Sequence, residues 1–92
     1  MKKYFVTSGD WNREVTANSY MEAATVAVEK IFKTDENVSF GAVVGVVEER
    51  YLKQRNTDRM RYIYGPTVLA NAGQYALANQ LKINIDKMKK SL

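Results

Sequence analysis

The chain has 92 residues, of which 46% are hydrophobic and 26% charged, with a formal net charge of +4; this composition fits one globular domain and excludes wholesale disorder. It contains no Cys and no His, which excludes disulfides, thiolate nucleophiles and the commonest acid–base and zinc-binding side chains. No apolar run approaches the roughly 20 residues of a membrane span, and no signal-peptide core opens the chain, so we expect a single cytoplasmic domain over residues 1–92 that makes no contact with a membrane.

The charge is unevenly distributed along the chain. Residues 1–49 carry five Lys or Arg against eight Asp or Glu, whereas residues 50–92 carry nine against two. Such asymmetry fits a surface for nucleic acid or an acidic partner. It also fits a contact between the basic face of one copy and the acidic face of another, or basic residues that only solvate exposed strands and a helix end.

The N-terminal residues predict a β-hairpin. Tyr4 to Ser8 and, more weakly, Arg13 to Ala17 alternate with β-favourable residue types, and the residues between them are rich in turn formers. Trp11, the only Trp, lies in this turn, where full burial is difficult. A partly exposed Trp either anchors an interface or caps the edge of the core.

The next segment predicts a helix over residues 20–33. Ser19 followed by Glu22 matches a capping box, in which Ser is the N-cap and Glu lies three residues further on. Apolar residues then recur at helical spacing as far as Phe32, with charged residues on the opposite side. Residues 34–37 are expected to form a loop.

Residues 40–47 form a near-continuous β-branched run that predicts a strand covered on both faces. Gly41 and Gly45 within it indicate a bulge or a close backbone approach. We expect the pairing to continue through residues 50–53, turn at residues 56–58 and return through Arg59 to Tyr64. Pro66 then ends the return strand, because Pro lacks a backbone N–H for the ladder.

The C-terminal third is expected to be helical. Thr67 is a candidate N-cap, Gly73 either stops this first helix or is tolerated within it, and the composition from Gln74 onward favours helix. Residues 81–86 also alternate as a strand would. The sequence therefore predicts an α+β fold, an antiparallel sheet in β-β-α-β-β-α order with the helices packed on one face.

The chain offers little for catalysis. Without His or Cys, an enzyme must use carboxylates, Lys, Tyr or Ser. The close carboxylate pairs are residues 35–36, expected in a loop, and residues 48–49, which a strand would point to opposite faces. No phosphate-binding or nucleophile-elbow motif occurs. We therefore expect no enzyme, no metal, no cofactor and no small-molecule substrate.

Residues 50–64 form the best candidate surface, because five Lys or Arg and three Tyr interleave there with a single Asp. Guanidinium groups suit phosphate contacts and aromatic rings suit stacking on unpaired bases. Alternatively, the face shared by Met60, Tyr62 and Tyr64 packs beneath the helices while the arginines keep the edge of the sheet in solution. The candidate nucleic-acid-binding residues are Arg50, Tyr51, Lys53, Arg55, Arg59, Arg61 and Tyr62.

A second candidate surface is an apolar stripe near the C-terminus. Its residues recur with a 4-4-3-4 spacing and so share one face of the predicted helix. Such a stripe packs in the core, or, if the helix projects beyond a small sheet, forms a seam for a partner or a second copy. The residues of this candidate protein interface are Leu77, Leu81, Ile85, Met88 and Leu92.

Four segments carry a resemblance to known proteins: Tyr4 to Asp10, Val15 to Ala17, Ser19 with Glu22 to Ala24, and, loosely, Thr67 to Gly73. The resemblance extends over about half of the chain. In these segments the chain resembles small accessory proteins of tailed phages, in particular T4-like phages of marine cyanobacteria. The resemblance implies a protein of the host cytoplasm that acts on host or phage machinery, or a minor virion component, and it brings no catalytic residues.

The leading hypothesis is a small non-enzymatic protein-binding module that associates with itself through the apolar stripe and complementary charge. The alternative is a nucleic-acid-binding protein that uses a basic, Tyr-interleaved hairpin over residues 50–64. A carboxylate-based enzyme is a distant third.

Overall fold

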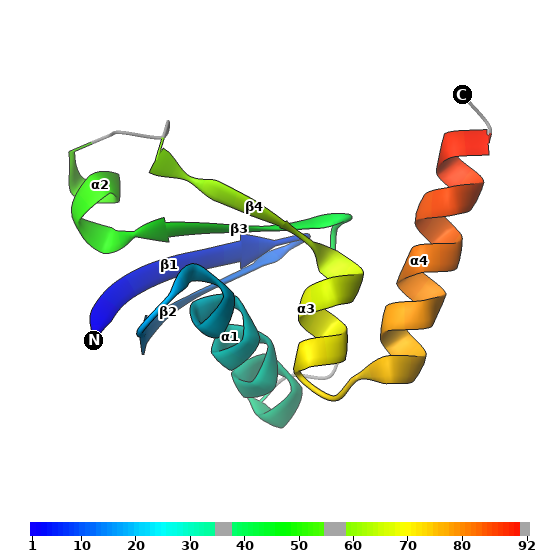
Figure 1. Ribbon diagram of the computed structural model, residues 1–92, viewed down its shortest axis with the longest axis horizontal. Coiled ribbons are helices and arrows are strands. Elements are labelled where there is room, and N and C mark those ends of the chain that lie inside the picture. Colours follow the sequence, from blue (N-terminus) through cyan, green and yellow to red (C-terminus); the bar gives the residue numbers. More distant parts are fainter. Residues whose placement is uncertain (35–37, 55–58, 91–92) are drawn as a thin grey trace.

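The computed structural model describes residues 1–34, 38–54 and 59–90. Its strands form one antiparallel sheet with the order β2-β1-β3-β4, and helices connect or follow them (Figure 1). The elements are β1 (Lys2–Ser8), β2 (Trp11–Ala17), α1 (Tyr20–Thr34), β3 (Val43–Glu48), α2 (Glu49–Lys53), β4 (Arg61–Tyr64), α3 (Gly65–Asn71) and α4 (Tyr75–Lys90). The α+β class and the antiparallel sheet are confirmed, whereas the element order is β-β-α-β-α-β-α-α rather than β-β-α-β-β-α.

The N-terminal hairpin is confirmed, although its second strand begins at Trp11 rather than Arg13. Gly9 and Asp10 form the two-residue turn, and Gly9 has a φ of +54°. The expected partial exposure of Trp11 is wrong, because its side chain is only 5% exposed. The ring packs edge-on against Phe40 with centroids 5.5 Å apart, so the segment before β3 covers the Trp11 side chain from one side.

The predicted helix over residues 20–33 is confirmed as α1, and the capping box forms. The Glu22 N–H donates to Ser19 Oγ at 3.1 Å, and the Glu22 carboxylate accepts a hydrogen bond from the Asn18 N–H at 3.2 Å. The helix packs on β1, β2 and β3 through a buried face with three small side chains. This face consists of Ala23, Ala24, Ala27, Val28 and Ile31.

β3 begins at Val43 rather than Phe40, and its residues from Val44 to Glu48 are buried on both sides of the strand, although only the side of Val44 and Val46 lies beneath α1. Val44 and Val46 point into the core beneath α1, while Gly45 and Val47 point to the opposite side. A Cβ on Gly45 would lie 3.1 Å from the Met60 sulfur, so the glycine leaves room for that side chain. The atoms close to Gly45 all belong to side chains, so the predicted close backbone approach is not found there, whereas a Cβ on Gly41 would lie 3.4 Å from the backbone nitrogen of Gly9.

The predicted continuation of the strand through residues 50–53 is wrong, because these residues form α2. Glu, Arg, Leu and Lys are good helix formers, Glu49 lies in the first turn, and an ion pair of 3.7 Å joins it to Lys53 one turn later. The return strand starts at Arg61 rather than Arg59 and still pairs with β3. The predicted turn at residues 56–58 lies outside the described residues.

The C-terminal third is helical, in two pieces. α3 begins at Gly65 with Pro66 in its first turn, so Thr67 lies within the helix and is not its N-cap. Gly73 follows the end of α3 with a φ of +81°, which confirms it as a stop. α4 includes residues 81–86, which are therefore helical and not a strand.

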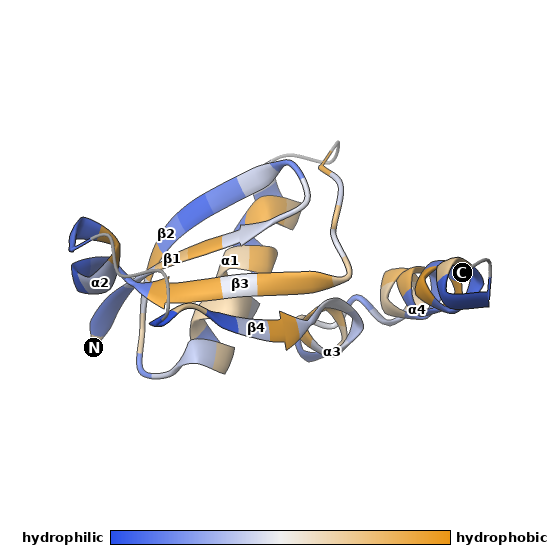
Figure 2. Cartoon of the chain, turned by 90° about the horizontal axis from the view of Figure 1, so that it is seen from above, coloured by the Kyte–Doolittle hydropathy of each residue, from blue (hydrophilic) through white to orange (hydrophobic). Residues whose placement is uncertain are grey.

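The helices leave one face of the sheet uncovered over β3 and β4. α1 lies on the other face with α3 beside it, and α2 turns at one end of the strands (Figures 1 and 2). α4 packs chiefly against α3 and stands beyond the end of the sheet. None of the helices in the described ranges is long and apolar enough to cross a membrane. We call the side of the sheet away from α1 the open face, although Gly45 and Val47 are themselves buried there; its residues are Phe5, Thr7, Val43, Gly45, Val47, Met60, Tyr62 and Tyr64.

Candidate functional site

Six cationic side chains gather where α2 turns at the end of the sheet. Two adjoining hollows of about 320 and 330 Å³ lie there and share Glu48 as a lining residue. Among the described residues, six cations and two carboxylates line them, which gives these side chains a net charge of +4. We call this region the basic end, made of Lys2, Lys3, Arg50, Lys53, Arg59 and Arg61 with Glu48 and Glu49.

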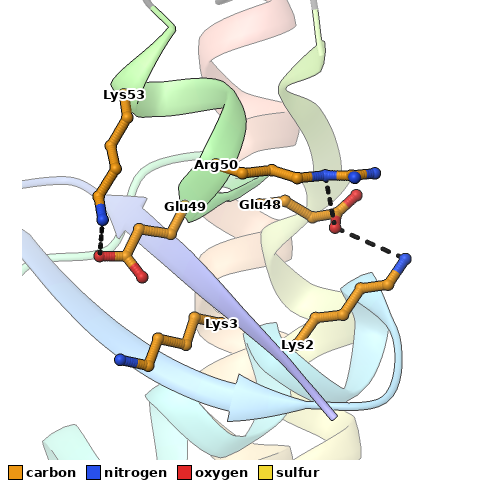
Figure 3. Close-up of a pocket in the computed structure, with 6 residues that line it drawn as sticks. All are labelled: Lys2, Lys3, Glu48, Glu49, Arg50 and Lys53. Carbon is orange, nitrogen blue, oxygen red and sulfur yellow. Dashed lines mark ion pairs between the residues drawn. The ribbon is translucent and has the colours of Figure 1, made fainter.

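Two ion pairs converge on Glu48, the last residue of β3. The residue is 7% exposed, and its Oε1 lies 3.5 Å from Lys2 Nζ and 3.4 Å from Arg50 Nε (Figure 3). A carboxylate this buried is stable only beside cations, so Glu48 orients the two side chains at the mouth of the hollow. Lys3 extends on the other side, towards Glu49 and Lys53.

Guanidinium groups cover two tyrosine rings of the basic end. Arg50 Cζ lies 4.6 Å and Arg59 Cζ 5.3 Å from the centroid of the Tyr51 ring, and Arg50 Nη2 donates to Tyr51 Oη at 2.7 Å. Arg61 Cζ lies 5.7 Å from the ring of Tyr20. Tyr51 was predicted to stack on bases, but its ring is engaged by arginines, so its part in the site is to hold them.

Tyr4 is the neighbour of Glu48 on the adjacent strand β1. Tyr4 pairs with Glu48 across the β1–β3 ladder and is 3% exposed. Burial raises the pKa of Tyr4 above its ordinary value, and the Glu48 carboxylate raises it further. Tyr4 therefore stays neutral here and adds no charge to the basic end at neutral pH.

The tyrosines of β4 lie on the open face. Tyr62 is 67% exposed and Tyr64 39% exposed, whereas Ile63 packs against the core. The alternative in which the face of Tyr62 and Tyr64 packs beneath the helices is therefore wrong. Ile63 pairs with Val44, whose side chain points to α1, and this register turns the tyrosines outward.

The predicted apolar stripe is divided by the packing of α4. Ile85 is 7% exposed, Leu77 is 37% and Met88 67% exposed, and Leu92 lies outside the described residues. Leu81 reaches towards Gly65, whose Cβ would lie 3.0 Å from it. Leu77 and Leu81 also line a groove of about 310 Å³ between α4 and the segment before β3. The groove is lined by Phe32, Val38, Ser39, Phe40, Leu69, Leu77, Gln80, Leu81 and Asn84.

The structure brings most of the predicted basic residues together and adds others. Arg50, Lys53, Arg59 and Arg61 meet at the basic end, whereas Arg55 lies outside the described residues. Sequence reasoning missed Lys2 and Lys3, because only the antiparallel pairing of β1 with β3 carries them to α2. It also missed the groove-lining aromatics of α1 and the segment before β3, and no local pattern marks those.

The described residues hold no group of three or more Asp or Glu side chains placed to bind a metal ion. Comparison with protein-family models, curated proteins and solved structures finds no match for this chain. The resemblance to phage accessory proteins therefore stays a prediction.

Proposed function

We propose that the protein binds nucleic acid through phosphate contacts at the basic end. The observation that carries this proposal is the convergence of six cations from β1, α2 and the start of β4 around two carboxylates, counted over the described part of the chain. Within the described ranges, Lys3, Arg59 and Arg61 make no ion pair with a carboxylate. Their charge is therefore available to a phosphate backbone.

The geometry of the arginines also favours contact with a phosphate group. A guanidinium offers a planar set of N–H donors that fits a phosphate in bidentate fashion. Arg50 and Arg59 are held against Tyr51, which lowers the entropy lost when they bind. Neither contact blocks a phosphate, because both side chains remain exposed.

The test is fluorescence anisotropy of labelled single- and double-stranded DNA and RNA at two salt concentrations. If about four phosphates are neutralised, raising salt from about 50 to about 200 mM weakens binding about 150-fold for duplex DNA and about 50-fold for a single strand. Arg59→Glu is expected to weaken binding to every sequence and to reduce the salt slope by about one.

Lys33→Glu is the matched control, since it removes the same charge from an exposed position in the last turn of α1. It is expected to leave the salt slope unchanged. No binding at the lower salt concentration would refute the proposal. If Arg59→Glu and Lys33→Glu weaken binding equally, the nucleic acid is attracted by the net charge of the protein and not by the basic end.

A second candidate function, protein binding, is favoured by the groove beside α4. Its lining is mostly apolar, and such a groove accepts a large apolar side chain of a partner or a second copy. The accessory role implied by the resemblance to phage proteins suits either function.

The self-associating form of this candidate is tested by sedimentation velocity. We expect Leu77→Lys, a change in the groove wall, to dissociate a dimer that Ile83→Lys leaves intact. Ile83 is a fair control because it is an exposed apolar residue of the same helix outside the groove, 48% exposed against 37% for Leu77. A wild-type protein that stays monomeric at high concentration would rule this form out.

A further inference from the structure

The open face exposes two aromatic rings in a row on one strand. Tyr62 and Tyr64 lie two residues apart on β4, so their side chains stand about 7 Å apart on the same face. They are 67% and 39% exposed, which is unusual for large side chains on a sheet with a buried opposite face. A residue pair of this kind is suited to stacking on two planar groups.

Gly45 has no side chain, so nothing projects from that position of β3 beside the ring of Tyr62. It pairs with Tyr62 across the ladder, and a Cβ there would lie 3.5 Å from Tyr62 Cε1 and 3.1 Å from the Met60 sulfur. Because Gly45 has no side chain, Met60 lies over the strand and forms an apolar floor next to the ring. The result is a shallow aromatic platform and not a deep pocket.

Cations lie towards both ends of this side of the sheet. At the α2 end, Lys3 shares the face of Phe5 on β1, two strands from β4, and lies near Glu49 and Lys53 (Figure 3). At the other end, Lys82 of α4 lines a hollow of about 360 Å³ together with Tyr64. Figure 2 shows this face between α2 and α4, with the hydrophobic strand β3 along its middle.

Carboxylates lie to the side of the platform or are already paired. Glu14 points to the same face from β2, the strand furthest from β4, and Glu49 pairs with Lys53. Planar stacking groups with negative charge on either side are the chemistry of a nucleotide chain.

From this arrangement we propose that the open face stacks the unpaired bases of a single-stranded nucleic acid on Tyr62 and Tyr64. The inference rests on the proposed phosphate binding at the basic end and names the class of nucleic acid. A duplex hides its base faces within its own stack, so the tyrosines reach them only in a single strand.

The test compares a thymidine oligonucleotide with a hairpin duplex that has the same number of phosphates. Tyr62→Ala is expected to weaken binding of the oligonucleotide about tenfold and to leave duplex binding nearly unchanged. Tyr62→Trp is expected to retain binding. Tyr75→Ala is the control, since Tyr75 is 68% exposed on α4 and does not belong to the open face.

The outcomes separate this inference from the proposed function. Salt-dependent binding of oligonucleotide and duplex with equal affinity, unchanged by Tyr62→Ala, would overturn the stacking and leave the phosphate contacts standing. No binding of either at low salt would overturn both. If Tyr62→Ala instead dissociates a dimer and leaves nucleic-acid binding unchanged, the open face is a contact between protein chains and the stacking proposal is wrong.

Discussion

Two glycines adopt the left-handed backbone conformation in different surroundings. Gly9 has a φ of +54°, and a Cβ there would lie 2.0 Å from the carbonyl oxygen of Ser39. Gly73 has a φ of +81° and nothing within 4 Å of its Cβ position. We expect Gly73→Ala to cost about 1–2 kcal/mol of unfolding free energy from backbone strain alone. Gly9→Ala is expected to cost about 1–3 kcal/mol more, because its Cβ would also overlap the Ser39 carbonyl oxygen. Urea unfolding of both variants measures the two losses of unfolding free energy, and equal losses would contradict the role given to this overlap.

The raised pKa of Tyr4 predicts a loss of stability at alkaline pH. Burial is the main cause and the Glu48 carboxylate the second, and both favour the neutral hydroxyl above its ordinary pKa of 10.0. In the unfolded chain Tyr4 ionises first, so its contribution is complete below pH 10.0 and is lost as the pH rises through the higher pKa of the folded state. Tyr4→Phe is expected to flatten the decline in unfolding free energy above that pH. Parallel pH curves for the two proteins would contradict the assignment.

At the scale of elements, α4 is the helix held by the fewest neighbours. It packs chiefly on α3, and Ile85, at 7% exposure, is one of its two buried residues. We expect Ile85→Asp to remove hydrogen-exchange protection from α4 while the amides of β1 and β3 keep theirs. Ile83→Asp, at an exposed position two residues earlier, serves as the control. Loss of a dimer with α4 still protected would instead identify the stripe as an interface.

Local signals predicted most elements but not the path between β3 and β4. The capping box at Ser19 and the stop at Gly73 depend on neighbouring residues only, and both are confirmed. Residues 50–53 include both helix-forming and strand-forming residue types. They form the helix α2 because they lie at the end of the sheet. The same limit applies to the site, because the pairing of Tyr4 with Glu48 spans 44 residues and no local pattern reveals that it carries Lys2 to Arg50.

The whole molecule is a flat body of 38 × 31 × 20 Å, because helices cover only one face of the sheet. A ligand that binds only the folded state stabilises it by mass action, by about 2.7 kcal/mol at a hundredfold excess over Kd. For a domain of this size we therefore expect a saturating thymidine oligonucleotide to raise the thermal midpoint by about 10–20 °C at low salt. Arg59→Glu is expected to reduce the shift at the same oligonucleotide concentration. An unchanged midpoint would contradict binding to the folded protein.

The burial of Trp11 provides an optical reporter that distinguishes the two candidate functions. Its indole contacts Phe40, and Phe40 stacks on Phe32 with centroids 5.6 Å apart; both phenylalanines line the groove beside α4. A partner that enters the groove changes the surroundings of this pair and so shifts the emission of the single Trp. The basic end lies at the opposite end of β1, beside Lys2 and Lys3. A nucleic acid bound there is therefore expected to leave the emission wavelength of Trp11 unchanged.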